Sequence, residues 1–433
     1  MLDESIETAA GVARSRRALL KGAAIVAGGV GGAIALSPGE AGAVTRTFNF
    51  NVFAYGATGG GITSDSAAIQ AAVNAASAVG GGIVILPAGT YLLTTGITIP
   101  NGVRLEGVGW HSPRIPDSNT FEGSWIHVRA SQNGHSFVPF TISGRGSSVR
   151  KLAFYLPEMP VPTATPDIGY QYSIVVNADD VVLEDIHLYN VAYGISAVGI
   201  GRTKMLRISG QPLATGIHMD QNHDTMTIDN VHFWPFWYIS AWTFQNGIGI
   251  ESLDNDNPLF TNIFCAGYRY GVRFGLGTNG QFTSKFKLSN ADLDGNYFGI
   301  WIDGINGSVI QPTGQMSNIT IQGQTNGLVN GLPNGGNSPG GIYSTNACTL
   351  FISNLRITNV YDNAIRIDSP SGSARYFIDG LWVDSWNLSQ AGFPGIEIVA
   401  GDSIAHVWIG TTRTFDIGFG APLIQPPGQF TLG

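Results

Sequence analysis

The sequence predicts an all-β fold: a right-handed, single-stranded parallel β-helix whose N-terminal end is capped by one α-helix. Two repeating patterns and one compositional bias lead to this prediction. The first pattern is an apolar residue, two turn-type residues and a second apolar residue. The second is glycine, a branched apolar residue, a variable residue and another apolar residue. The bias is 59 glycines and only 12% charged residues in a chain of 433, whereas ordinary domains contain about 25% charged residues.

The first pattern marks sharp corners of the chain. Its third position is Asn, Asp or Gly in nearly every copy, with Lys151 as the exception, and those residues tolerate a left-handed backbone. Successive corners lie roughly 20 to 44 residues apart, within the range of repeat architectures. The copies begin at Leu105, Val149, Leu183, Ile208, Ile228, Phe260, Leu288, Met316, Ile352 and Ile378.

The second pattern marks strands between the corners, because alternation with period two is the strand signature. We expect each repeat to form one coil of a solenoid that stacks parallel strands around an apolar interior. The right-handed preference of parallel crossovers sets the expected hand. The copies begin at Gly194, Gly216, Gly247, Gly271, Gly299, Gly341, Ala364 and Gly395.

The first 43 residues have the features of an export signal. Ser15–Lys21 (SRRALLK) resembles the twin-arginine motif, Gly22–Leu36 is a Gly/Ala-rich apolar run, and Ala41–Ala43 is a small-residue cleavage site. The alternative is a membrane anchor, but the run is shorter than the roughly 20 apolar residues that span a bilayer. We therefore expect twin-arginine export, a periplasmic or extracellular location and no membrane in the mature form.

Charge and cysteine content exclude further classes. The net charge is −8, the isoelectric point is near 5.4 and no basic run follows the N-terminus, so nucleic acid is not an expected partner. Cys265 and Cys348 fall on inward positions about three coils apart. At roughly 4.8 Å per strand, that distance is too long for a disulfide, so both are predicted to be buried free thiols.

Residues 44–100 are predicted to form a cap module, and residues 101–433 to form the coils and a C-terminal tail that lacks periodicity. Within the cap, Asp65 is expected to start a helix over about residues 65–79, because an N-cap residue precedes an Ala-rich segment with helical apolar spacing. The exposed apolar end of a solenoid has to be covered. We expect this helix to cover it.

Three strings in the cap resemble a known family. Tyr55–Ala57, Asp65–Ala72 and Leu86–Tyr91 are similar to the N-terminal module of the pectate-lyase-like superfamily, and the similarity covers residues 52–110. That superfamily includes rhamnogalacturonase-type enzymes, glycoside hydrolase family 28 relatives and phage tailspike depolymerases. The resemblance implies a right-handed β-helix that acts on a polysaccharide. The catalytic signatures of polygalacturonases and of calcium-dependent pectate lyases are not found, so catalytic residues are inferred from coil geometry.

The outer face of the second set of strands is unusually rich in functional side chains. Sugars bind by stacking on aromatic rings and by hydrogen bonds to charged groups, so we expect a polysaccharide groove on this face. The alternative is a surface held by ion pairs such as Arg366 with Asp368. The outward pairs are expected to be Ser196/Val198, His218/Asp220, Gly249/Glu251, Arg273/Gly275, Trp301/Asp303, Tyr343/Thr345, Arg366/Asp368 and Glu397/Val399.

Three carboxylates are catalytic candidates. Asp220 and Glu251 lie on adjacent coils, about 5 Å apart at the backbone, and Glu251 and Asp303 lie two coils, about 10 Å, apart. Glycosidase carboxylates are separated by roughly 5 Å for retention and about 6.5–9.5 Å for inversion. A neighbouring carboxylate favours the protonated form of one member. Glu251 is therefore the predicted acid, with Asp220 or Asp303 as base or nucleophile of a glycoside hydrolase.

The alternative reaction is β-elimination from a uronate. Arg273 would then lie near the substrate carboxylate or act as base, which requires a large fall in its pKa because arginine is otherwise always charged. Further predicted substrate-binding residues are in two groups. The outer face supplies His218, Arg273, Trp301, Tyr343, Arg366 and Asp368. Loops that are expected to wall one side supply Trp234, Trp237, Tyr268 and Arg269.

No cofactor or metal is predicted. Asp254–Asn257 offers oxygen ligands that Ca²⁺ prefers, and His218 and His223 lie near Asp220, but neither set has a specific ligand spacing. His187 and His232 share one outward position and are expected to be surface residues.

Two functional classes remain. The first is an exported, endo-acting polysaccharide-degrading enzyme, and the second is a non-catalytic glycan-binding or surface-structural solenoid. Three arginines on one face of an acidic protein, Arg269, Arg273 and Arg366, point to a uronate-bearing polymer. The sequence does not identify the glycan, the stereochemical outcome or the oligomeric state.

Overall fold

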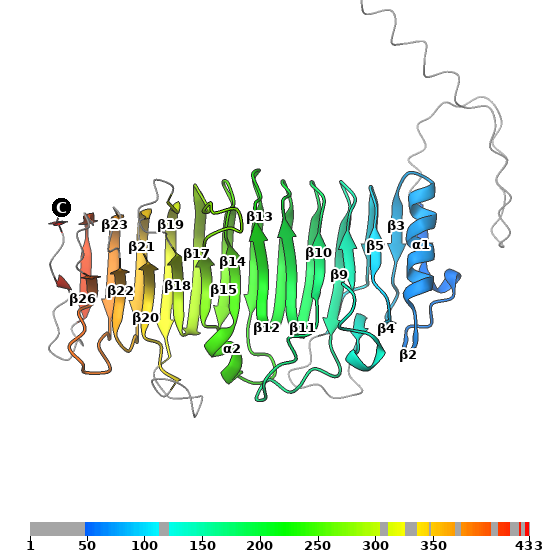
Figure 1. The fold of residues 1–433 in the computed structure, drawn as a ribbon, viewed down its shortest axis with the longest axis horizontal. Helices are drawn as coiled ribbons and strands as arrows, with labels where there is room; N and C mark the ends of the chain where they lie inside the picture. The colour runs from blue at the N-terminus through cyan, green and yellow to red at the C-terminus, as the bar shows by residue number, and fades with distance from the viewer. Residues whose placement is uncertain are drawn as a thin grey trace, which may run out of the picture. The chain divides into compact units, whose positions relative to one another are not determined.

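The computed structural model is a parallel β-helix with few helices, and the predicted fold class is confirmed (Figure 1). It describes residues 48–111, 121–303, 311–324, 336–345, 348–368, 374–399, 406–415, 424–425 and 429–432. The predicted export segment, residues 1–43, lies outside these residues. Within the described ranges, no helix combines the length and apolar character that crossing a bilayer requires.

Helix α1 (Ser66–Ala78) covers the N-terminal end of the coils, as predicted. It buries Ile69, Val73 and Ala76 and contacts the first strands on either side of it in sequence (Figure 1). Asp65 is its N-cap residue, but the carboxylate accepts from the backbone N–H of Thr58 at 2.6 Å and makes no capping bond to the helix. The preceding elements are β1 (Asn49–Asn51), η1 (Val52–Tyr55) and β2 (Gly60–Ser64), and the following ones are β3 (Gly82–Ile85), β4 (Gly89–Leu93), β5 (Ile97–Ile99) and β6 (Val103–Glu106).

The coils continue from β7 through the described C-terminal strands, and the ladders between named strands are parallel. The elements are β7 (Ser124–Val128), η2 (Ala130–Gln132), β8 (Phe140–Ile142), β9 (Ser148–Tyr155), β10 (Tyr172–Val176), β11 (Val182–Val198), β12 (Lys204–Asp220), β13 (Thr227–Phe233), α2 (Ala241–Asn246), β14 (Ile248–Ser252), β15 (Leu259–Ala266), β16 (Tyr270–Phe274) and β17 (Phe286–Asn296). They are followed by β18 (Phe298–Asp303), β19 (Thr313–Gly323), β20 (Gly340–Thr345), β21 (Thr349–Thr358), β22 (Asn363–Asp368), β23 (Arg375–Asp384), β24 (Ile396–Val399), β25 (His406–Ile409), β26 (Thr412–Phe415), β27 (Ile424–Gln425) and β28 (Gln429–Leu432).

The predicted corners bend the strands through a left-handed residue. Asn262, Asn290 and Asn318 have φ between 53° and 55°, and their amides form a ladder, in which Nδ2 of Asn290 donates to Oδ1 of Asn262 at 3.3 Å and Nδ2 of Asn318 donates to Oδ1 of Asn290 at 3.1 Å. Two copies depart from the prediction, and in the copy that begins at Leu105 the third residue, Gly107, does not have a positive φ. The corner near Ile208 is Arg207, with φ 54°, because the register pairs Ile208 with Ile186 and Val231.

A ladder of glycines starts the strands of the second pattern. An ideal Cβ on Gly216 would lie 2.4 Å from the carbonyl oxygen of Gly249, and one on Gly249 would lie 2.6 Å from that of Gly271. The stacked backbones leave no room for a side chain there. One repeat therefore begins at Gly249 and not at Gly247, which instead follows α2 as its C-cap residue.

The interior is an apolar column, with rings such as Phe274 and Phe286 stacked at 3.8 Å between centroids. Cys265 and Cys348 are buried and free, which confirms the prediction for both. The C-terminal end differs from the expected tail, because β27 pairs with β24 and β28 pairs with β25 and so continue the coil.

Candidate active site on the outer face

One residue from each of eight successive coils lines up along the outer face. His218 pairs with Glu251, Glu251 with Arg273, and Arg273 with Trp301 in the parallel ladders. The predicted alignment of these side chains along one flank is therefore confirmed, although their functional roles stay predictions. We call this set the polar row: Ser196, His218, Glu251, Arg273, Trp301, Tyr343, Arg366 and Glu397.

The position of Glu251 in this row corrects the expected pair Gly249/Glu251. Because the repeat begins at Gly249, Glu251 takes the first outward position, between His218 and Arg273, and it does not share the second position with Asp220. Its contacts are a histidine and a guanidinium. The argument that a neighbouring carboxylate keeps Glu251 protonated is therefore wrong.

The Asp220 carboxylate is hydrogen-bonded to a neighbouring loop. Its side chain is almost fully buried, and Oδ2 accepts from the backbone N–H of Thr278 at 3.2 Å and from the Thr278 hydroxyl at 2.9 Å. These bonds hold the loop that follows β16. Asp220 and Glu251 lie on adjacent coils, but among the described residues no hydrogen bond joins the Asp220 carboxylate to the contacts around Glu251.

A continuous chain of charged contacts runs through four coils. Nδ1 of His218 lies 2.7 Å from Oε2 of Glu251, and Nη1 of Arg273 donates to Oε1 of Glu251 at 2.8 Å. Arg273 also donates to Oδ2 of Asp303 from Nε at 2.8 Å and from Nη2 at 2.6 Å. Burial acts to lower the pKa of Arg273, but Asp303 and Glu251 raise it overall. Arg273 is therefore not a base, and that form of the elimination hypothesis is wrong.

Aromatic rings continue the row beyond Arg273. The rings of Trp301 and Tyr343 stack at 4.4 Å with an interplanar angle of 1°. Nε1 of Trp301 donates to Oδ1 of Asp303 at 2.5 Å, and the Tyr343 hydroxyl donates to Oδ2 of Asp368 at 3.3 Å.

Arg366 ends this part of the row with an ion pair different from the expected one. Its Nη1 lies 3.0 Å from Oε2 of Glu397, one coil further on, and no described ion pair joins it to Asp368. Its guanidinium carbon also lies 5.6 Å from the centroid of the Tyr343 ring.

A second row of aromatic residues was missed. It lies three residues before the position of the polar row in each coil, so the period-two alternation of the strands does not predict it. The Tyr172 ring lies 6.0 Å from the His218 ring, and the Tyr270 ring lies 5.0 Å from the Trp301 ring. Burial, followed by the charge of Glu251, raises the pKa of Tyr172 above its ordinary value. The row contains the aromatic residues Tyr172, Tyr193, Tyr270 and Phe298, with Thr215 and Ile248 on the two coils between Tyr193 and Tyr270.

The predicted loop wall is only partly formed. Arg269 borders the aromatic row, since its Nε donates to the Tyr270 hydroxyl at 2.9 Å. Tyr268 is wrong as a substrate-binding residue, because its ring is buried and its hydroxyl donates to the Pro212 carbonyl at 2.9 Å. Trp234 and Trp237 pack beside Phe264 and Tyr189, on the face that follows the corners.

The two histidines that were expected at the surface differ in their exposure to solvent. His232 is exposed, but His187 is fully buried beneath Trp110, with the two rings 4.3 Å apart. Burial lowers the pKa of His187 to about 3. Trp110 comes from a segment far upstream, so the local sequence around His187 gives no sign of this cover.

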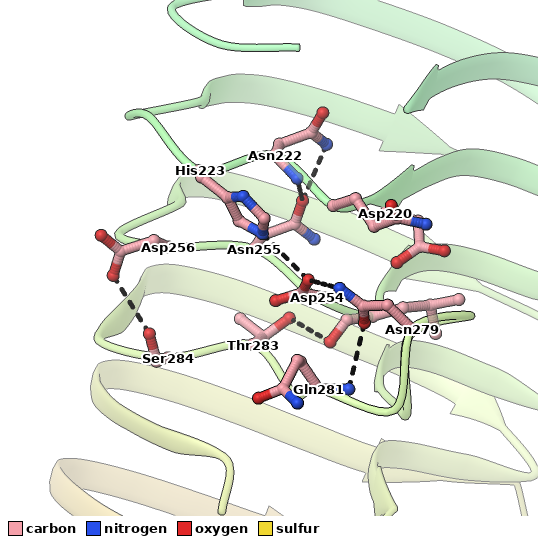
Figure 2. Close-up of polar contacts among 12 residues, drawn as sticks. Asp220, Asn222, His223, Asp254, Asn255, Asp256, Asn279, Gln281, Thr283 and Ser284 are labelled. Atoms are coloured by element: carbon pink, nitrogen blue, oxygen red, sulfur yellow. Dashed lines mark hydrogen bonds and ion pairs between the residues drawn. The ribbon is translucent and has the colours of Figure 1, made fainter. Parts of the chain in front are cut away.

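The polar side chains of the turns next to Asp220 are hydrogen-bonded to one another (Figure 2). Oδ2 of Asp254 contacts Nε2 of His223 at 2.9 Å and accepts from Nδ2 of Asn279 at 2.7 Å, whereas Asp256 accepts from Ser284 at 3.0 Å. Asp254 and Asp256 thus bind different partners. In the part of the chain that the structure describes, no three His, Cys, Asp or Glu side chains are grouped to hold a metal ion.

Comparison with known proteins confirms the resemblance of the cap. Residues 49–143 match the family model for rhamnogalacturonase A/epimerase, pectate lyase-like proteins. Mannuronan C5-epimerase AlgE1 of Azotobacter vinelandii is 46% identical over 68 residues, which are 14% of this chain and 5% of that protein. Alginate lyase 7 of the same organism is 34% identical over 101 residues, which are 22% of this chain and 12% of that protein. These matches cover only a small part of the relatives' length.

Solved structures share the β-helix over most of the chain. A tailspike protein of the E. coli bacteriophage HK620, in complex with a pentasaccharide, has a TM-score of 0.57 at 10% identity, over 86% of this chain and 67% of the tailspike chain. The exopolygalacturonase of Thermotoga maritima has a TM-score of 0.51 at 11% identity, over 85% and 92% of the two chains. At these identities the likeness shows the fold.

Proposed function

We propose that this chain is a polysaccharide-modifying enzyme that removes the C5 proton of a uronate residue bound along the polar row and so cleaves the polymer by β-elimination. The similarity of part of this chain to a mannuronan C5-epimerase and to an alginate lyase supports a polyuronate substrate. The family-model match, residues 49–143, does not include the polar row. The chemistry therefore rests on one observation, the hydrogen-bonded chain from His218 through Glu251 to Arg273.

His218 has the geometry of a general base. A carboxylate can only accept, so the bond between Nδ1 and Glu251 places the imidazole proton on Nδ1 and leaves the Nε2 lone pair available. Among the described residues, none hydrogen-bonds to Nε2. An orienting carboxylate behind a histidine is the arrangement that fixes the tautomer of catalytic bases.

Neighbouring groups supply the other requirements of elimination. The C5 proton of a uronate lies next to the sugar carboxylate, and removing it places negative charge on that carboxylate. Arg273 provides a fixed positive charge two coils from His218 on the same face, and such a charge stabilises a developing carboxylate charge. The raised pKa of Tyr172 keeps its hydroxyl protonated, so this residue is the proposed proton donor to the leaving glycosidic oxygen.

A panel of polysaccharides tests the proposal. We expect polyuronates, but not neutral polymers, to give new reducing ends together with the ultraviolet absorbance of a conjugated double bond. Uptake of solvent deuterium at C5 without chain cleavage would instead indicate epimerisation by the same base. Binding without turnover of any polymer would contradict the enzyme and leave the non-catalytic glycan-binding protein.

Hydrolysis is a second candidate, because Glu251 and Asp303 both bind Arg273. Two oxygens on one planar guanidinium lie within about 8 Å of each other, which overlaps the separation of about 6.5–9.5 Å in inverting glycosidases. Both carboxylates are paired with a cation, however, and neither is placed as a protonated acid. Reducing ends without a double bond would favour hydrolysis over elimination.

Export is part of the proposal, because a polysaccharide of this kind lies outside the cytoplasm. The SRRALLK string and the following apolar run support the twin-arginine route. Replacing Arg16 and Arg17 by Lys is expected to retain the chain in the cytoplasm, as measured by cell fractionation. Unchanged export would contradict this route.

A further inference from the structure

A cavity of about 450 Å³ lies away from the polar row, on the face formed by the strand segments that come directly after the corner residues. It falls within the size range of small-molecule sites. His127 of β7 and Tyr155 of β9 sit side by side in the ladder and form part of its wall. The exposed side chain of Ile62 also lines the cavity, so the cavity reaches solvent. The side chains that matter for the argument are Thr90, Phe121, His127, Arg129, Tyr155 and Trp237.

His127 is a buried polar side chain without a hydrogen-bond partner. Only 5% of it is exposed, and neither ring nitrogen has a partner among the described residues. Its ring makes edge contacts with Phe121 at 5.1 Å and Tyr155 at 5.3 Å. Burial, followed by the charge of Arg129, lowers the pKa of His127 to about 3, so the neutral ring offers one donor and one acceptor. Native proteins rarely leave such groups unsatisfied.

Arg129 supplies a positive charge to the same cavity. Its side chain is half-buried, Nε is buried without a partner, and no described carboxylate forms an ion pair with it. Glu158 interacts electrostatically with Arg129, but its carboxylate accepts a hydrogen bond from the backbone N–H of Ser131 at 2.7 Å. The guanidinium is therefore available to an anion from outside the chain.

Aromatic rings give the cavity apolar walls. Phe121 stacks on Tyr155 with centroids 5.0 Å apart, and Trp237 lies parallel to Tyr189 at 6.3 Å. Aromatic walls suit the C–H face of a pyranose, neutral imidazole suits a hydroxyl, and a guanidinium suits a carboxylate. One ligand class combines all three groups.

We propose that this cavity is a binding site for a hexuronate residue, with the carboxylate on Arg129, a hydroxyl on His127 and the sugar ring against Trp237 and Phe121. The site would hold a uronate end or branch at a distance from the polar row. The proposal does not depend on the reaction at the polar row, because binding in the cavity requires no turnover.

Calorimetric titration of the full chain with free glucuronate and mannuronate tests the proposal. We expect saturable binding of at least one of them, and binding of glucose and of acetate to be at least about tenfold weaker, because each lacks one of the matched groups. Arg129→Gln is expected to weaken hexuronate binding about tenfold or more. Arg145→Gln, at an exposed arginine paired with Asp179, is the matched control and should leave binding unchanged.

Two further variants separate this cavity from the polar row. Trp237→Ala lies on a loop outside the core and should also weaken hexuronate binding, which keeps the test valid if Arg129→Gln fails to fold. In Arg273→Gln, which disables the uronate contact proposed at the polar row, hexuronate binding in the cavity should persist. Loss of binding in Arg273→Gln with full binding in the Arg129 and Trp237 variants would overturn the proposal, as would the absence of saturable binding to the wild type.

Discussion

Nδ1 of His218 lies 2.7 Å from Oε2 of Glu251, although the two residues are 33 positions apart in the sequence. They are direct partners in the ladder between β12 and β14, so the stacking of coils creates the contact. Glu251 is 8% exposed, and its second oxygen binds Arg273. The β-helix thus holds a histidine, a carboxylate and a guanidinium in fixed order on one face.

Replacing Glu251 by Gln tests the orienting role. The amide keeps the shape but removes the charge that holds the proton on Nδ1 of His218 and balances Arg273. We expect kcat on a polyuronate to fall about 10²-fold or more, with little change in KM.

The control for this variant is Glu184→Gln. Glu184 is a half-buried carboxylate that, like Glu251, is paired with arginine, including Arg150 at 2.7 Å, but it lies before a corner on another face. Its replacement should leave kcat within about twofold of the wild type. Equal losses in both variants would mean that Glu251 acts on stability alone.

Gly249→Ala is expected to destabilise the chain. The new Cβ would lie 2.6 Å from the carbonyl oxygen of Gly271 and 2.9 Å from Sγ of Cys265, so the stacked coils would have to separate. We expect the free energy of unfolding to fall by about 2 kcal/mol or more in denaturant titration. At Gly60, where a Cβ meets no atom within 4 Å, the same change should cost much less. Similar losses at both positions would contradict the assigned register.

Both thiols are expected to be unreactive in the native state. Burial raises the pKa of Cys265 far above its ordinary range and that of Cys348 to about 11, so neither forms an accessible thiolate near neutral pH. Titration with a thiol reagent should detect no fast-reacting group in the native protein and two after denaturation, since the sequence contains two cysteines. A fast native thiol, or fewer than two in denaturant without reductant, would contradict the buried free pair.

The buried His187 predicts a loss of stability in acid. Its pKa is about 3 in the folded chain against an ordinary value of 6.5, so the unfolded state binds the proton more tightly. The corresponding stability is fully present above pH 6.5 and is lost as the pH falls toward 3. The free energy of unfolding should drop between pH 7 and pH 5, and it should drop less in His187→Gln. Equal slopes in both proteins would show that His187 is exposed in solution.

Local sequence patterns predicted the coils because each corner and strand carries its own signal. Asn262, Asn290 and Asn318 mark left-handed corners, and Gly216 and Gly271 mark places where backbones stack. These signals depend on residues within one repeat. They were therefore readable without knowing the neighbouring coils.

The errors occurred where the deciding contact comes from another coil or a distant segment. The string Gly247-Ile248-Gly249-Ile250 offers two possible frames, and only the close approach of Gly249 to Gly271 selects the second one. His187 looks like a surface residue until Trp110 is placed over it. The cavity around His127 likewise combines side chains from several strands and a loop.

The most direct test of the proposed function is the initial rate of double-bond formation on a polyuronate by His218→Gln, compared with the wild type. The amide fills the imidazole site but cannot accept the C5 proton. We predict that the rate falls about 10²-fold or more while the dissociation constant for the polymer changes less than about threefold. A His218→Gln rate close to that of the wild type would contradict the assignment of the catalytic base to the polar row.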